Sequence, residues 1–323
     1  MRDRGAKDFP ALGFGCGAVL GRVGRRDSLR AMEAAWDAGI TLFDTARSYG
    51  YGEAEGLLGE FLAGRREQAT VMTKFGIWPE RQGTLKSLAK PVVRGLLRLA
   101  PGARSLVRRG AAGQMTANQF TVPVLRASLE ESLRRLRTDY VDVLFLHAAP
   151  ASALEQDDLM AELERVVAEG KVRRAGLSAE PEVIGLALDR GLPVLQTMQF
   201  PVNVFGLGIT QRTQAADEDA PLFVANHPFG GVLRVEESRR MIAELSTSEN
   251  LPPDLREKLS GGSNLLLADV IFSLILRGTG IDTVVPAMMK VENLRTNAEA
   301  IAKSRFTEAE VALLRERFLA AAS

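Results

Sequence analysis

The strongest constraint on the fold is an alternation between short apolar runs and longer segments with helical spacing. Segments with helical spacing are found at 27–38, 122–136, 154–169 and 291–304. Eight runs have the length and composition of buried strands, at 11–14, 41–44, 70–74, 141–147, 173–178, 194–199, 222–226 and 282–285. Strands that alternate with helices predict a parallel sheet. Eight such units in about 300 residues favour a (β/α)8 TIM barrel of class α/β.

An open, doubly wound sheet is the alternative arrangement of the same elements. Such a sheet is expected to carry Gly-x-Gly-x-x-Gly between its first strand and first helix. The chain has Gly13-Phe-Gly15-Cys-Gly17 there, with the third glycine out of place. The barrel is therefore the better interpretation.

Length and composition bound the domain organisation and the partners. A chain of 323 residues fits one large barrel or two ordinary domains. No linker or low-complexity tract divides it, so we expect one barrel domain over 1–323. Thr307 and Glu310 have the spacing of a capping box, which predicts a last helix near the C-terminus. The net charge of +1 gives no general attraction to nucleic acid or membrane.

Cysteine and histidine usage restricts the location and the chemistry. The single cysteine, Cys16, excludes an internal disulfide and a Cys-cluster metal site, which fits a reducing cytoplasm. With two histidines, a His-rich metal site is also excluded, and we expect no metal. The first residues lack the apolar core of a signal peptide, and no uncharged apolar run approaches the ~20 residues that span a bilayer. We therefore expect a cytoplasmic protein.

One segment, 76–120, interrupts the alternation. It is much longer than the usual strand-to-helix loop of ~2–6 residues, and loops of this length tend to be functional or mobile. It is also strongly basic, with Arg81, Lys86, Lys90, Arg94, Arg98, Arg104, Arg108 and Arg109 against one acid, Glu80. One interpretation is a lid that attracts bulky or anionic substrates. The other is a solvated basic face, which is what charge runs usually are.

Four polar residues stand at or just after the ends of three early strands. Asp44 and Tyr49 lie in Leu-Phe-Asp-Thr-Ala-Arg-Ser-Tyr-Gly (42–50), Lys74 ends the run 70–74, and His147 ends the run 141–147. The carboxyl ends of barrel strands meet at the active-site face. We therefore expect these four side chains to converge.

The four residue types suit the reduction of a carbonyl, which needs a hydride at carbon and a proton at oxygen. A tyrosine with a pKa of ~10 needs a nearby cation to exchange its proton near neutrality. Lys74 can supply that cation, Asp44 can hold Lys74 in place, and His147 can orient the substrate oxygen. Tyr49 is then the general acid and base. Taken singly, each residue is better explained as a cap, an anchor or a structural side chain, but the ordered set is not.

In these residues and in their order, the chain resembles the aldo-keto reductase family over nearly its whole length. The resemblance implies the same four catalytic roles and a nicotinamide dinucleotide, NADPH or NADH, bound by the second half of the barrel. It implies that Ser178 and Gln199 hold the carboxamide, that Phe229 and Gly231 line the pyrophosphate, and that Asn297 meets the adenine.

The cofactor residues depart from the family pattern at several positions. Ala179 stands where the family commonly has Asn, and Val202 where a Tyr stacks on the nicotinamide. The remaining departures are His227 for a Ser, Ala287 and Met288 for a Lys-Ser pair on the 2′-phosphate, and Asn293 for an Arg. Lys290 either takes over the phosphate contact or is a solvated lysine at a helix start, and both interpretations stay open. So does the preference between the two cofactors.

Three functions follow from these patterns. The first is an NAD(P)(H)-dependent oxidoreductase that interconverts a small-molecule carbonyl and an alcohol. The second uses the same pocket for redox-neutral proton transfer, as in a dehydratase or isomerase. The third is a non-catalytic dinucleotide-binding protein on the reductase scaffold. The fold alone does not choose between them.

Overall fold

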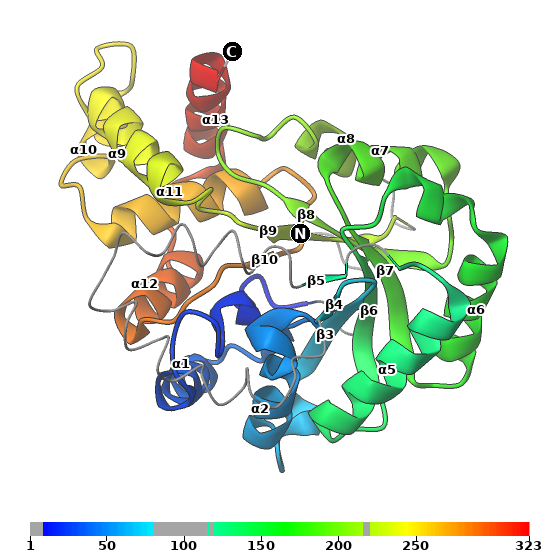
Figure 1. The fold of residues 1–323 in the computed structure, drawn as a ribbon. Coiled ribbons are helices and arrows are strands. Elements are labelled where there is room, and N and C mark those ends of the chain that lie inside the picture. The colour runs from blue at the N-terminus through cyan, green and yellow to red at the C-terminus, as the bar shows by residue number, and fades with distance from the viewer. Residues whose placement is uncertain (1–8, 80–114, 117–118, 216–219, 323) are drawn as a thin grey trace.

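The computed structural model describes residues 9–79, 115–116, 119–215 and 220–322. Eight strands form one parallel sheet in the order β1-β2-β3-β6-β7-β8-β9-β10 (Figure 1). They are β1 (Phe14–Gly15), β2 (Leu42–Asp44), β3 (Thr70–Phe75), β6 (Val141–His147), β7 (Val172–Ser178), β8 (Leu195–Pro201), β9 (Leu222–Asn226) and β10 (Thr283–Val285). The (β/α)8 barrel predicted from the alternation is confirmed.

Helices follow the strands and lie around the sheet (Figure 1). They are α1 (Arg25–Asp37), α2 (Ala54–Phe61), α5 (Val122–Leu136), α6 (Asp157–Ala168), α7 (Pro181–Arg190), α8 (Thr210–Gln214), α9 (Val232–Ser246), α10 (Pro253–Lys258), α11 (Asn264–Leu276), α12 (Val291–Ala302) and α13 (Glu308–Ala322). Short 3-10 turns are η1 (Cys16–Ala18), η2 (Tyr49–Gly52), η3 (Arg66–Gln68) and η5 (Ala151–Glu155). Within the described ranges, no helix is long and apolar enough to cross a membrane.

The predicted elements agree with the structure except at particular boundaries. The helix expected over 154–169 is divided into η5 and α6, because Gln156 between them has extended backbone angles. Thr307 and Glu310 form the expected capping box: Glu310 N donates to Thr307 Oγ1 at 3.3 Å, and Thr307 N donates to Glu310 Oε2 at 2.7 Å. Segment 76–120 begins and ends at a two-stranded antiparallel ladder of β4 (Trp78–Pro79) and β5 (Met115–Thr116). Its basic positions lie outside the described residues.

The barrel closes where its first and last strands meet. The strand expected over 11–14 is reduced to β1, and the residues before it bond to β10 instead. Gly13 N donates to Val284 O at 2.8 Å, Val284 N to Ala11 O at 2.9 Å, and Gly15 N to Pro286 O at 3.0 Å. A Cβ at Gly15 would lie 2.8 Å from Val285 O, so this seam requires glycine.

The lumen of the barrel is filled by apolar side chains that alternate with outward-facing ones along each strand. They form a cluster of Phe9, Leu42, Met72, Val143, Phe145, Leu222, Val224 and Val285. Side chains two residues apart in a strand point to the same face. Asp44, Lys74 and His147 therefore point to the lumen, as do the residues two positions before them, Leu42, Met72 and Phe145.

We expect Gly15→Ala to lower the free energy of unfolding by about 1–3 kcal/mol, because the added methyl group is forced against backbone at the seam. Gly56→Ala is the matched control. Gly56 lies inside α2, and a Cβ there meets no atom of the described residues within 4 Å, so alanine is expected to be neutral or to stabilise the helix by up to about 1 kcal/mol. Urea unfolding of both variants measures the difference. Equal stabilities would contradict the close contact at Gly15.

Candidate active site

The four residues that the sequence singles out lie together at the carboxyl-terminal end of the barrel. Asp44 ends β2, Lys74 is the penultimate residue of β3, and His147 ends β6. Tyr49 begins the 3-10 turn η2, which follows β2 and returns over the strand ends. The expected convergence is thus present in the structure, and the geometry around each residue indicates what it can do.

Lys74 and Asp44 form a buried ion pair. Lys74 is 1% exposed and Asp44 4%. Lys74 Nζ donates to Asp44 Oδ1 and, at 2.9 Å, to Thr45 O. Burial by itself lowers the pKa of Lys74, but the Asp44 carboxylate and Tyr49 outweigh burial and hold that pKa above its ordinary value. The ammonium group is therefore charged at neutral pH.

Tyr49 lies between this cation and His147. Lys74 Nζ is 5.2 Å from the centre of the Tyr49 ring, and the imidazole of His147 meets the ring edge-on with centroids 5.9 Å apart. Burial raises the pKa of Tyr49, and the charge of Lys74 opposes that rise. From the sequence, only the effect of the cation on this pKa was expected. In the structure, desolvation is the larger effect, and Lys74 limits the rise instead of bringing the pKa below its ordinary value.

His147 is a neutral imidazole in this setting. Burial, followed by repulsion from the Lys74 charge, lowers the pKa of His147 to about 3. Its Nδ1 is buried and has no hydrogen-bond partner among the residues that the structure describes. A neutral imidazole can offer one N–H to a substrate oxygen. The position of the ring against Tyr49 would bring that oxygen near the phenol.

A hydrogen-bonded chain joins the two residues expected at the carboxamide to the ion pair. Ser178 Oγ donates to Gln199 Oε1 at 2.8 Å, and Gln199 Nε2 donates to Asp44 Oδ1 at 3.1 Å. The chain runs from β7 through β8 to β2 across the lumen. The contact between Gln199 and Asp44 was missed at the level of sequence, because 155 residues separate them and no local pattern links them.

The other expected cofactor residues lie on the segments after β9 and β10, apart from the four-residue cluster. Phe229 packs edge-on against Phe272, Met288 is buried in the core, and Asn297 is buried in α12. The exposed ones are His227, Gly231 at the start of α9, Lys290 at the start of α12, and Asn293 in its first turn. Asn226 was also missed at the level of sequence; its Oδ1 at the end of β9 is buried without a partner in the described part of the chain.

These segments have the features of a dinucleotide site. In barrels of this class the loops after the seventh and eighth strands and a helix N-terminus often hold a phosphate, and β9 and β10 are those strands. Gly231 has φ +89°, and a Cβ there would meet no described atom within 4 Å, so its backbone faces open space. The unpaired Asn226 Oδ1 offers an acceptor, and Ser178 with Gln199 offers polar groups at the lumen. The residues present therefore fit a nicotinamide dinucleotide.

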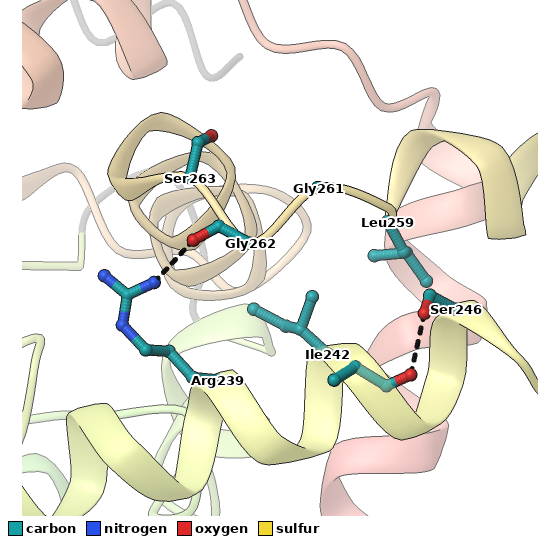
Figure 2. A pocket seen from close by; sticks show the side chains of 8 residues that line it. Arg239, Ile242, Ser246, Leu259, Gly261, Gly262 and Ser263 are labelled. Carbon is teal, nitrogen blue, oxygen red and sulfur yellow. Dashed lines mark hydrogen bonds between the residues drawn. The ribbon is translucent and has the colours of Figure 1, made fainter.

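A hollow of about 90 Å³ lies away from the strand ends, between α9 and the turn before α11 (Figure 2). Its lining includes Ile242, Leu259 and Arg239. The Arg239 guanidinium donates to Gly262 O at 2.8 Å and to Asn264 Oδ1. Both terminal nitrogens of Arg239 are thus engaged, and the hollow offers little to an anionic ligand.

Comparison with known proteins places this geometry in a family. A profile described as "Aldo/keto reductase family" matches residues 11–317. A D-threo-aldose 1-dehydrogenase of a Pseudomonas species is 34% identical over 53% of this chain and 50% of that protein. A methylglyoxal reductase of Escherichia coli K12 is 31% identical over 48% of this chain and 39% of that protein. The chain thus spans about half the length, or less, of these curated relatives in aligned residues.

Solved structures share the fold over nearly the whole chain. An aldo-keto reductase of Bacillus halodurans in its holo form has a TM-score of 0.68 at 21% identity, covering 97% of this chain and 92% of that one. An aldo/keto reductase of Klebsiella pneumoniae in complex with NADP and acetate has a TM-score of 0.61 at 23% identity, covering 96% and 92%. At these identities the likeness concerns the fold.

The lowered pKa of His147 predicts a pH dependence of stability. Between pH 6.5, the ordinary value, and about 3, the unfolded chain binds a proton that folded His147 does not. The contribution of neutral His147 to the free energy of unfolding is therefore complete above pH 6.5. As the pH falls below 6.5, the free energy of unfolding decreases by about 1.4 kcal/mol per pH unit. The variant His147→Asn lacks this dependence. Urea unfolding of both proteins from pH 6.5 to 4 should give free energies whose difference changes with that slope, and a constant difference would contradict a neutral His147.

Proposed function

This chain belongs to the aldo/keto reductase family, and we propose on that premise that it interconverts a small-molecule carbonyl and an alcohol with NADPH or NADH. The observation that carries the proposal is the buried Lys74–Asp44 pair beside Tyr49 at the carboxyl ends of the strands. A charged lysine held in a buried site is costly unless it is paired. Its position beside a phenol gives that phenol a stabilised anionic form.

Tyr49 is proposed as the general acid in reduction and the general base in oxidation. When the phenol gives its proton to the carbonyl oxygen, the phenolate that remains is stabilised by Lys74, whose charge Asp44 retains. His147 is proposed to hold the substrate oxygen with a hydrogen bond, as a neutral donor does when charge develops on an oxygen. All three contributions come from side chains that the barrel fixes in place.

The cofactor, when bound, supplies or accepts the hydride. Ser178 and Gln199 are proposed to hold its carboxamide over the lumen, and Gly231, Phe229 and the start of α9 to line its pyrophosphate. The solved relative from Klebsiella pneumoniae is in complex with NADP, which supports a nicotinamide dinucleotide as the cofactor. Because Met288 is packed in the core, its side chain is a poor candidate for the 2′-phosphate, which leaves Lys290 and Asn293 on the surface.

The substrate class is proposed from the names of the relatives and from the basic residues of segment 76–120. An aldose dehydrogenase and a methylglyoxal reductase both act on small oxygenated carbonyl compounds or their alcohols. The basic positions between 80 and 114 would favour a bulky or anionic member of that class.

We expect Tyr49→Phe to reduce kcat by about 10²–10⁴-fold, since general acid catalysis is lost. Dinucleotide affinity, followed by reduced-nicotinamide fluorescence, should stay within about twofold if the phenol acts on substrate alone. Tyr140→Phe is the matched control. The Tyr140 ring is held between Arg66 and Arg173 just before the start of β6, at the opposite end of the barrel. Its loss should leave kcat unchanged.

Two outcomes would overturn the assignment in different ways. Turnover of a carbonyl or hydroxy compound by protein free of dinucleotide would favour redox-neutral proton transfer in the same pocket. Tight dinucleotide binding with no turnover of any carbonyl would favour a binding protein.

Lys290 is proposed to contact the 2′-phosphate of the cofactor at the start of α12. A charge-assisted contact of this kind contributes about 1.5–3 kcal/mol, so Lys290→Met should weaken NADPH binding by about tenfold or more and leave NADH binding unchanged. Lys303→Met, at the other end of the same helix, is the control. Titration with both cofactors measures the effect. Equal losses for the two forms would place the contact of Lys290 on a part that both cofactors share, and no loss for either would assign Lys290 to the solvated surface.

A further inference from the structure

A second buried ion pair, Arg47 with Glu55, lies next to the candidate active site, and the proposed chemistry does not use it. Arg47 is 3% exposed and Glu55 1%. Arg47 Nη1 donates to Glu55 Oε2 at 2.5 Å. Burying two opposite charges is a weak source of stability, because desolvation offsets their attraction. A role in positioning neighbouring residues would explain why such a pair is buried here.

Glu55 connects the turn that carries the tyrosine to the strand that carries the lysine. Its second oxygen, Oε1, accepts from Thr73 Oγ1 at 2.7 Å. Thr73 directly precedes Lys74 in β3, and because side chains alternate, it faces outward toward α2 while Lys74 faces the lumen. Arg47 lies two residues before Tyr49, and the backbone N–H of Arg47 donates to the backbone O of Lys74 at 3.4 Å. The Glu55 carboxylate thus binds Arg47, which precedes Tyr49, and Thr73, which precedes Lys74. It holds both segments from the outer side of the barrel.

The guanidinium also lies near two further groups, although its Nε has no hydrogen-bond partner among the described residues. Its carbon lies 5.4 Å from the centre of the Trp78 ring, and Nη2 lies 3.9 Å from Glu131 Oε1. Trp78 belongs to β4, and Glu131 to α5. A planar guanidinium can bond a carboxylate along its edge while its face lies against a ring, which an ammonium cannot reproduce. Arg47, two residues before η2, therefore contacts three neighbouring elements, α2, β4 and α5.

We propose that the Arg47–Glu55 pair is a positioning device that fixes Tyr49 relative to Lys74 for proton transfer. This inference rests on the proposed function, in which Tyr49 exchanges the proton. Neither residue of the pair needs to touch substrate or cofactor. The effect expected from losing the pair is large because misplacement by about 1 Å can reduce a rate about a hundredfold.

The test is the double variant Arg47→Met with Glu55→Gln. Both charges are removed together, so no unpaired buried charge remains, and the amide oxygen introduced by Glu55→Gln can still accept from Thr73. We expect a folded protein with kcat lowered by about 10–100-fold and with KM and dinucleotide affinity within about twofold of wild type. As Tyr49 moves away from Lys74, the opposing effect of that charge weakens, so the limb of the kcat–pH profile that belongs to Tyr49 should move to higher pH.

Glu33 and Arg65 supply the matched control. Arg65 Nη1 donates to Glu33 Oε2 at 2.8 Å, and its guanidinium lies 4.8 Å from the Phe61 ring. The pair thus repeats the carboxylate and ring contacts of Arg47, in a more exposed place. This pair joins α1 to the turn between α2 and η3, away from the turn that carries Tyr49. Arg65→Met with Glu33→Gln should leave kcat and its pH profile unchanged. A loss of the same size in this control would overturn a specific positioning role.

The remaining outcomes separate the inference from the proposed function. A double variant of Arg47 and Glu55 with the kcat and pH profile of wild type overturns positioning alone. Wild-type protein that binds dinucleotide but turns over no carbonyl overturns the proposed function, and positioning for proton transfer with it. If the double variant does not fold, Arg47→Lys carries the test, because it keeps the charge. A fall in kcat with an upward shift of the pH profile supports positioning, and wild-type behaviour overturns it.

Discussion

The site is organised around the contact of one ammonium group with one carboxylate inside a barrel. Lys74 and Asp44 are almost entirely removed from water, and two charges in such a place are tolerated only when they are paired and further hydrogen-bonded. Thr45 O and Gln199 Nε2 supply those further bonds. The lumen rows below them consist of apolar side chains, which exclude water from beneath the pair. Tyr49 and His147 meet above the pair, and each has its proton affinity set by the same burial and the same cation.

Much of this arrangement could be predicted from the sequence, because it depends on the spacing of apolar residues and on the order of the strands and helices along the chain. Alternating strands and helices predict the barrel, and a barrel brings the carboxyl ends of its strands together. Asp44, Lys74 and His147 at strand ends are therefore expected to meet. The pKa of Tyr49 was harder to predict, because the depth of burial around a phenol depends on packing from several elements. The direction of the shift followed desolvation and not the nearby cation.

Other parts of the site depend on contacts that no local pattern records. Gln199 meets Asp44 across the lumen, and Glu55 meets Thr73 only because α2 packs behind β3. The expected cofactor site could be predicted only in part. The helix N-termini after β9 and β10 follow from the barrel fold, but the burial of Met288 and the exposure of Lys290 do not. The family pattern places position 288 at the 2′-phosphate, and Lys290 was considered from the sequence as a replacement contact. Packing in this chain makes Met288 a core residue and leaves Lys290 at the surface.

The glycine seam has a consequence for how the chain reaches its native state. Thr283 Oγ1 bonds to Pro10 O across 273 positions of sequence, and the seam bonds of Gly13 and Gly15 span similar distances. During synthesis, the first strand lacks this neighbour until the residues of β10 have also left the ribosome. Contacts so remote in sequence form slowly, and an edge that waits for its partner is open to association with other chains. The same closure that completes the lumen thus leaves the nascent protein with a late, exposed step that chaperones are suited to protect.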